Sequence, residues 1–249
     1  MSTEWIYGFH AVTTVLRSRP SDIQSLLLDA QRNDGRAKSL IAVAQEHGIT
    51  VQRVPRSRLD AIIPDGRSQG VVAEVLMGTA QGESALTDLL DGLEGPPFLL
   101  ILDGVQDPHN LGACLRTAEA AGVNAVIAPK DRAVGLTATV RKVAAGAVER
   151  VAFFQVTNLA RSLRELKERG VWLVGLAGDG EKSLYETSLT GPLAVVLGAE
   201  GSGLRRLTAE LCDFKVHIPM VGGTESVNVS VATGIALFEA VRQRRFASR

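Results

Sequence analysis

Short runs of apolar residues alternate with segments that carry apolar residues at helical spacing along the first 76 residues. Continuous or alternating apolar runs of this length are typical of strands, whereas a spacing of three to four residues is typical of a helix. The pattern predicts helices over 8–18 and 35–47, and strands over 23–29, 48–54 and 70–76. These elements are sufficient for a compact α/β unit.

A stronger alternation begins at residue 97. The run FLLILD at 98–103 is apolar throughout, as expected for a strand that is covered on both faces. The same reasoning predicts further strands over 124–128, 171–177, 193–198 and 215–219, with helices over 110–121, 137–145, 158–169 and 228–245. Such strand–helix alternation predicts an α/β domain with a mostly parallel sheet and helices on both sides.

The segment between these two parts differs in character. Residues 77–96 contain four glycines and end in a proline, around one short helical run. Glycine and proline interrupt regular elements, so this composition favours a linker. The predicted organisation is therefore an N-terminal domain over 1–76, a linker over 77–96 and a larger domain over 97–249.

The overall charge does not favour binding to nucleic acid, because 27 basic residues balance 27 acidic residues. Any contact with RNA must therefore depend on local clusters of arginine. Taken alone, each such cluster is explained more simply as a solvated helix face or loop. Three clusters are candidates: Arg53, Arg56 and Arg58; Arg205 and Arg206; and Arg242, Arg244, Arg245 and Arg249 near the C-terminus.

Several classes of protein are disfavoured. The two cysteines, Cys114 and Cys212, lack the spacing of a metal site or a disulfide framework, so neither a metal nor a disulfide is expected. No N-terminal signal segment is recognised, and no apolar run approaches the ~20 residues of a membrane helix. We therefore expect a cytoplasmic protein that does not enter a membrane.

In open α/β sheets ligands bind beyond the carboxyl ends of the strands, and the segment after 98–103 has unusual residues there. Asp107 and Pro108 predict a turn, after which Asn110 is placed to cap the next helix. Arg116 stands beside an apolar stripe, and a half-buried guanidinium group needs an anionic partner. An RNA phosphate would serve, but so would Glu119 one turn later.

Two other strand ends also carry candidate ligand-binding groups. VVLGAEGSGL at 195–204 is glycine-rich but has neither the GxGxxG nor the P-loop spacing, and the carboxylate of Glu200 would repel a phosphate. This favours a ligand that is cationic or free of phosphate, such as S-adenosylmethionine, although a simple glycine-rich turn is the alternative. In the segment 217–234, Ser226 is the expected helix cap, and Asn228 adds an amide near the same helix end.

These three segments, in this order, resemble the three motifs of the SpoU (TrmH) family of RNA ribose 2′-O-methyltransferases. NLGACLR at 110–116 is similar to the first motif, LGAEGSGL at 197–204 to the second, and IPMVGGTESVNVSVATGIALFEA at 218–240 to the third. The segments 98–132, WIYGFHAV and SQGVVAEV also resemble the branch of this family that methylates a guanosine in the peptidyl-transferase P loop of 23S rRNA. The resemblance covers essentially the whole chain.

The resemblance implies a knotted, SPOUT-type catalytic domain with a deep trefoil knot, and a smaller ribosomal-protein-like N-terminal domain that binds the RNA substrate. It also implies a homodimer with active sites at the subunit interface, with S-adenosylmethionine as cofactor and 23S rRNA as partner. The implied reaction-site residues are Asn110, Arg116, Glu200, Ser226 and Asn228, and the implied cofactor-binding residues are Leu197, Gly198, Ile218, Met220 and Val227.

The family assigns the proton-accepting role to the arginine that corresponds to Arg116. Arginine stays protonated in proteins, so we favour a mechanism in which Arg116 binds a neighbouring RNA phosphate and the pair handles the proton. Three alternatives are a non-catalytic ribosome-assembly factor, a methyltransferase acting on tRNA or another rRNA nucleotide, and a nucleotide-dependent oxidoreductase. The complete motif set disfavours a non-catalytic assembly factor, and the absence of GxGxxG disfavours an oxidoreductase. The motifs do not distinguish a 23S rRNA enzyme from one that acts on tRNA or on another rRNA nucleotide.

Overall fold

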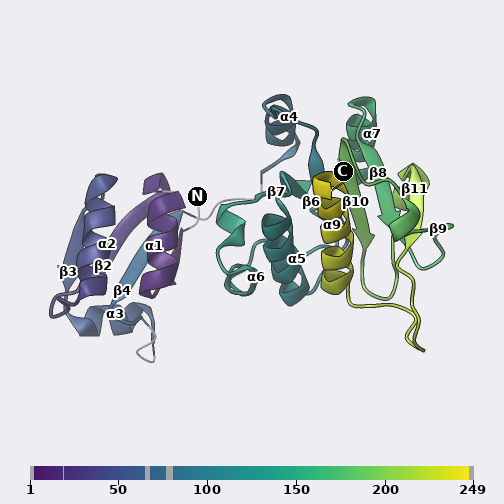
Figure 1. Cartoon of the computed structure of the whole chain (residues 1–249). Helices are drawn as coiled ribbons and strands as arrows, with labels where there is room; N and C mark the ends of the chain where they lie inside the picture. Colours follow the sequence, from purple (N-terminus) through teal and green to yellow (C-terminus); the bar gives the residue numbers. More distant parts are fainter. Residues whose placement is uncertain (1–2, 19, 65–67, 77–80, 247–249) are drawn as a thin grey trace. The chain divides into compact units, whose positions relative to one another are not determined.

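The computed structural model describes residues 3–18, 20–64, 68–76 and 81–246. The chain divides into two compact units, Met1–Thr79 and Ala80–Arg249, which Figure 1 colours from purple to blue and from blue through teal to yellow. Each unit has its own sheet and its own core.

The N-terminal unit is a four-stranded mixed sheet in the order β1-β4-β2-β3. One face packs on α1 and α2 through residues such as Leu16, Leu26 and Leu40, and the other face packs on α3 through Leu59. Its elements are β1 (Thr3–Tyr7), α1 (Phe9–Ser18), a 3₁₀ turn (Pro20–Asp22), β2 (Ile23–Asp29), α2 (Gly35–Glu46), β3 (Val51–Val54), α3 (Arg56–Ile62) and β4 (Val71–Leu76).

The C-terminal unit is a seven-stranded sheet in the order β7-β6-β5-β10-β8-β11-β9, and all of its strand pairs are parallel. The strands are β5 (Phe98–Asp103), β6 (Ala125–Pro129), β7 (Ala152–Val156), β8 (Trp172–Leu176), β9 (Lys182–Ser183), β10 (Leu193–Gly198) and β11 (Phe214–His217). This is the predicted α/β architecture. The trefoil knot that the family resemblance implies stays a prediction.

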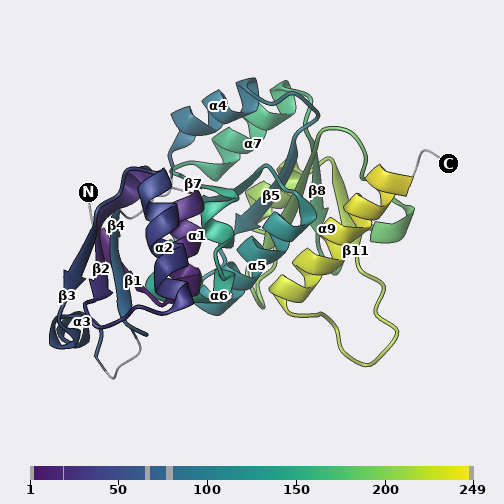
Figure 2. The same cartoon turned by 60° about the vertical axis from the view of Figure 1, so that its left-hand side comes forward.

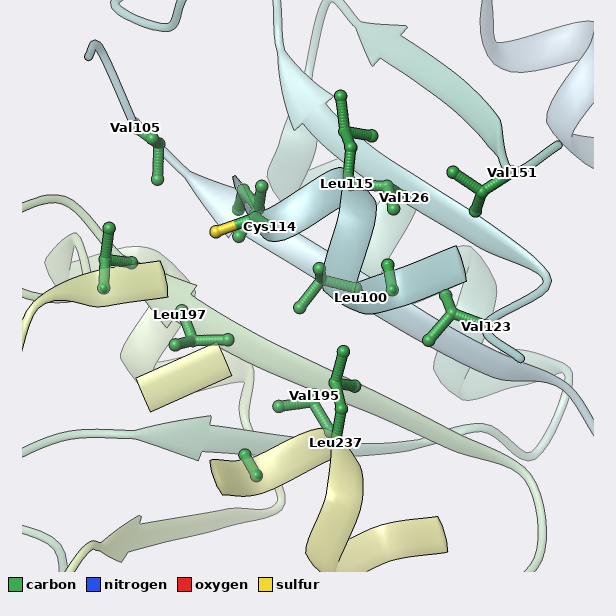
Figure 3. Packing of buried hydrophobic residues seen from close by; sticks show 14 of the residues in the cluster. Leu100, Val105, Cys114, Leu115, Val123, Val126, Val151, Val195, Leu197 and Leu237 are labelled. Atoms are coloured by element: carbon green, nitrogen blue, oxygen red, sulfur yellow. The ribbon is translucent and has the colours of Figure 1, made fainter. Parts of the chain in front are cut away.

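Helices cover both faces of this sheet, so its central strands are buried on both sides. One face packs on α5 (Pro108–Ala121), α6 (Ala138–Ala144) and α9 (Val229–Phe246), and Figure 3 shows Leu115 of α5 and Leu237 of α9 against Leu100 and Val195 of the sheet. The other face packs on α4 (Glu83–Asp91), α7 (Leu159–Glu168) and α8 (Arg206–Leu211), as the second view makes visible for α4 and α7 (Figure 2).

The structure differs from the sequence prediction in the segment 77–96. Residues 77–80 lie outside the described residues, but residues 81–96 belong to the C-terminal unit rather than to a free linker. Gln81 forms a parallel bridge with Phe154, and α4 buries Leu86 against the sheet. The glycines flank a packed helix, so composition alone gave the wrong interpretation of these residues.

Candidate active site

The loops that follow β5, β10 and β11 bring distant parts of the chain to one edge of the C-terminal sheet. Gly198 at the end of β10 is in register with Asp103 at the end of β5, so these two loops start side by side. The third loop follows β11, which is separated from β10 by β8 alone. A pocket of about 480 Å³ opens at this edge between the loops.

The pocket contains every residue that the resemblance assigned to the cofactor. It also contains three of the five residues assigned to the reaction site. From the predicted set, the lining includes Leu197, Gly198, Ile218, Met220 and Val227, together with Glu200, Ser226 and Asn228. Asn110 adjoins the pocket through its hydrogen bonds, whereas Arg116 is not part of the lining.

Gly198 is required by the tight loop that forms one wall of the pocket. Ala199 and Gly203 exchange backbone hydrogen bonds of 3.1 and 3.0 Å, which folds residues 199–203 back onto the end of β10. A Cβ atom at position 198 would lie 2.0 Å from the carbonyl carbon of Gly203. No side chain fits there, so glycine at this position is a steric requirement.

Three polar side chains, Asn110 from the first turn of α5, Glu200 from the loop after β10 and Asn228 from the loop before α9, form one hydrogen-bonded network. The amide nitrogen of Asn228 donates to Oε1 of Glu200 at 2.9 Å and to Oδ1 of Asn110 at 3.1 Å. The amide nitrogen of Asn110 also donates to Oε1 of Glu200. Asn110 is only 8% exposed, and a buried amide needs such partners. The network therefore joins the start of α5 to the loops after β10 and β11.

The helix caps differ from those predicted. Asp107, not Asn110, caps α5, because its side chain accepts a hydrogen bond from the backbone nitrogen of His109 at 2.7 Å. Ser226 precedes the start of α9 by three residues, and Asn228 instead accepts from the backbone nitrogen of Ser230 at 2.8 Å. Asn110 is thus free for the network, and the cap interpretation of Ser226 was wrong.

Arg116 is exposed on α5, not half-buried as predicted. It forms no ion pair with any residue that the structure describes. Glu119, the nearest candidate on the helix, instead pairs with Arg150 at 2.7 Å. The alternative in which Glu119 neutralises Arg116 was therefore wrong, and the guanidinium group is available to an external anion.

Sequence reasoning missed three residues that shape this edge. Asp103, which is fully buried, forms an ion pair with Arg205 and so holds the loop after β10 against β5. His217 bonds through Nδ1 to the carbonyl oxygen of Gly180 at 3.0 Å, which fixes the loop 177–180 beside the pocket. Glu225 lines the pocket as a second carboxylate. For Glu225 the only signal in the sequence was a lone carboxylate between Thr224 and Ser226, and it follows no spacing rule.

The pocket is acidic. Glu200 and Glu225 line it, and no lysine, arginine or histidine is among its lining residues. The neighbouring Cys114 offers no nucleophile, because burial raises the pKa of its thiol to about 11. Within the part of the chain that is described, no group of side chains is arranged to hold a metal ion, and no helix is long and apolar enough to cross a membrane.

A parallel sheet with a ligand pocket at its carboxyl edge, bordered by an asparagine–carboxylate network, is the architecture of an α/β enzyme that binds a small molecule. Residues 97–238 match the model of the SpoU rRNA methylase family, and residues 5–78 match that of the RNA 2′-O ribose methyltransferase substrate-binding domain. The chain belongs to the SpoU rRNA methylase family.

Relatives of known name resemble nearly the whole chain. The 23S rRNA (guanosine-2′-O-)-methyltransferase RlmB of Pseudomonas syringae is 54% identical over 97% of this chain and 96% of its own length. The protein of the same name from Shewanella oneidensis is 55% identical over 96% of this chain and 97% of its own.

Solved structures have the same fold. The SpoU methyltransferase AviRb from Streptomyces viridochromogenes, in complex with AdoMet, superposes with a TM-score of 0.80 at 22% identity, covering 99% of this chain and 92% of its own. The TrmH/SpoU tRNA modifying enzyme of A. aeolicus superposes with a TM-score of 0.55 at 32% identity, covering 65% of this chain and 83% of its own.

Proposed function

We propose that this chain transfers a methyl group from S-adenosylmethionine to the ribose 2′-hydroxyl of a guanosine in 23S rRNA, in the peptidyl-transferase P loop. The names of relatives that are 54% and 55% identical support the rRNA substrate and the ribose 2′ position. The observation that carries the proposal is the network of Asn110, Glu200 and Asn228 beside an acidic pocket. We place the reaction in the cytoplasm.

The charge of the pocket fits S-adenosylmethionine better than a phosphate-containing cofactor. This cofactor carries a sulfonium and an ammonium group, and the two lining carboxylates, Glu200 and Glu225, match those positive charges. A dinucleotide would place its phosphates against the same carboxylates. The pocket volume of about 480 Å³ is also that of a small-molecule site.

Bound S-adenosylmethionine supplies a methyl group on a good leaving group, so the chain itself must position and deprotonate the ribose hydroxyl. The network orients the carboxylate of Glu200 and the amide of Asn228 at the mouth of the pocket. Ser226 adds a hydroxyl group to the same rim. These residues would hold the ribose in line with the pocket.

Arg116 acts on the RNA side of the reaction in this mechanism. Its exposed, unpaired guanidinium group is suited to a bidentate contact with a phosphate. The RNA phosphate next to the reacting ribose would complete the site. The arginine–phosphate pair, rather than the arginine alone, would then take up the proton that leaves the hydroxyl group.

Substitution of Glu225 tests the proposed role of pocket charge. A Glu225→Gln variant keeps the shape of the side chain but removes one carboxylate, so its affinity for S-adenosylmethionine should fall by about 5- to 10-fold, measured by isothermal titration calorimetry. Glu168→Gln on α7, on the opposite face of the sheet, is the matched control and should bind like the unchanged protein. Equal affinities for all three proteins would contradict the proposed charge match.

We also propose that the chain forms a homodimer through α9. Val231 and Phe238 are 50% and 49% exposed and lie seven residues, or two turns, apart on one face of this helix. An exposed apolar stripe of this kind is typical of a protein–protein interface.

A Phe238→Asp variant should therefore sediment as a monomer at micromolar concentration in analytical ultracentrifugation, while the unchanged protein sediments as a dimer. Leu207→Asp on α8 is the matched control, since this apolar side chain is 43% exposed but belongs to the other face of the sheet. A Phe238→Asp dimer as stable as that of the unchanged protein would rule out this interface.

A further inference from the structure

One end of the N-terminal sheet gathers an unusual number of arginines. The carboxyl ends of β1 and β2 lie beside the start of β4, since Gly8 and Asp29 donate backbone hydrogen bonds to Val71 and Gly70. The end of β3 joins them, because Val54 is in register with Asp29. Figure 1 shows α3 lying across this end of the sheet. Five arginines belong to the last residues of β3, to the loop after β2 or to the first turn of the helix that follows: Arg32, Arg36, Arg53, Arg56 and Arg58.

These five residues, which we call the arginine edge, are not all neutralised by the acids around them. Arg32 pairs with Asp34 at 2.6 Å, and Arg56 pairs with Asp60 at 3.4 Å. Arg36, Arg53 and Arg58 form no ion pair with any carboxylate among the described residues. All three are exposed. Three positive charges of the arginine edge are thus exposed to solvent and unneutralised by any described carboxylate.

Arg53 is held rigidly although it lacks a carboxylate partner. Its Nη1 atom donates to the carbonyl oxygens of Arg32 at 2.6 Å and Asp29 at 3.2 Å, and its Nη2 atom donates to Oδ1 of Asn33 at 3.5 Å. These neutral acceptors fix the guanidinium group without cancelling its charge. An arginine that is positioned in advance loses less side-chain entropy when it binds an anion.

The opposite end of the same sheet has the reverse charge. Glu4 and Glu74 lie near the free ends of β1 and β4, while Asp22 precedes β2 and Glu46 ends α2. Arg17, in the last turn of α1, is a basic side chain at this end. Acidic side chains are thus concentrated at this end of the sheet and arginines at the other, although the whole chain has no net charge.

In the other two clusters, Arg245 is exposed without an ion pair to any described residue, but the remaining described arginines are engaged by neighbouring groups. Arg205 is paired with the buried Asp103, and Arg206 with Glu210 at 2.6 Å. Near the C-terminus, Arg242 pairs with Glu239 at 2.7 Å and Arg244 covers the ring of Phe98, while Arg249 lies outside the described residues.

We propose that the arginine edge binds the phosphate backbone of the RNA substrate, with Arg36, Arg53 and Arg58 as the contacting residues. This inference rests on the proposed function. Three open guanidinium groups on one rim suit successive phosphates, to which arginine binds as a planar fork. Contacts of this kind position the RNA without reading its sequence, so the arginine edge contributes affinity and orientation rather than choice of nucleotide.

The full-length Arg36→Gln/Arg53→Gln/Arg58→Gln variant tests this surface. Its Kd for a 23S rRNA transcript, measured without cofactor, should rise about 10-fold or more at 150 mM salt. The slope of log Kobs against log salt concentration should become less negative by about 2. The KM for RNA should rise while kcat at saturating RNA and the Kd for S-adenosylmethionine stay unchanged. Arg17→Gln is the matched control and should leave RNA binding unaltered.

Two further results separate the possible outcomes. The double variant Arg36→Gln/Arg58→Gln removes side chains that hydrogen-bond to no described residue, so weaker RNA binding by this variant, with an unchanged Tm, supports direct contact. RNA binding by both variants that equals that of the unchanged protein would overturn the inference, even if methyl transfer is intact. If the unchanged protein transfers no methyl group but the triple variant still loses RNA affinity, the proposed function fails and the arginine edge stands.

Discussion

An Arg116→Lys variant is expected to lose methyl transfer by about 100-fold or more, although it keeps the positive charge. The structure leaves the guanidinium group exposed and without an ion-pair partner among the described residues, so the role that we propose for it involves an external group. Lysine is a point charge and lacks the planar fork that grips a phosphate bidentately. The rate should be measured in single turnover with saturating RNA and S-adenosylmethionine.

Two controls accompany this measurement, the affinity of the Arg116→Lys variant for S-adenosylmethionine and the activity of an Arg161→Lys variant. Calorimetry should give an unchanged Kd for S-adenosylmethionine, since Arg116 does not line the pocket. Arg161→Lys on the exposed side of α7 should retain full activity. Full activity of Arg116→Lys would mean that charge alone suffices, and the arginine–phosphate mechanism would have to be abandoned.

A Gly198→Ala variant should abolish measurable binding of S-adenosylmethionine, with Kd rising by about 100-fold or more. The added Cβ would lie 2.0 Å from backbone carbon and 2.1 Å from backbone oxygen of Gly203, so the loop 199–203 must move. That loop carries Glu200, and its displacement would also break the network with Asn110 and Asn228. Calorimetry with the full chain measures the effect.

Gly223→Ala is the matched control for this substitution. Gly223 lies in the loop before α9, where an added Cβ would meet no atom within 4 Å, and binding should be preserved. The Tm of Gly198→Ala should fall only modestly, because the clash lies at the edge of the sheet rather than in its core. Cofactor affinity in Gly198→Ala within about twofold of the unchanged protein would refute the steric requirement.

The sequence predicted the central strands well because they are buried on both faces. β5 and β10 are continuous apolar runs, and the structure places both strands at the predicted residues. The edge strand β7 was missed, since Ala152–Val156 is short and contains the polar Gln155. The packing of α4 depends chiefly on the burial of Leu86 against distant residues, which no local pattern reveals.

The candidate site was predicted from motif order rather than from geometry. Asn110 and Glu200 are 90 residues apart, and only the parallel pairing of β5 with β10 brings them together. The predicted burial of Arg116 failed because the apolar residues beside it point into the core while the arginine points outward. The sequence also could not show which of the three arginine clusters is neutralised by ion pairs. Some of these pairs arise from tertiary contacts, such as that of Arg205 with Asp103.

Mapping of 2′-O-methylation on total RNA tests whether this chain methylates a ribose 2′-hydroxyl in 23S rRNA. Cells that lack this protein should be missing one modification, at a guanosine in the peptidyl-transferase P loop of 23S rRNA. A plasmid copy of the unchanged gene should restore it, and the Arg116→Lys copy should not. A complete set of 23S rRNA modifications in the deletion strain, or a loss confined to tRNA, would show that 23S rRNA is not the substrate of this chain.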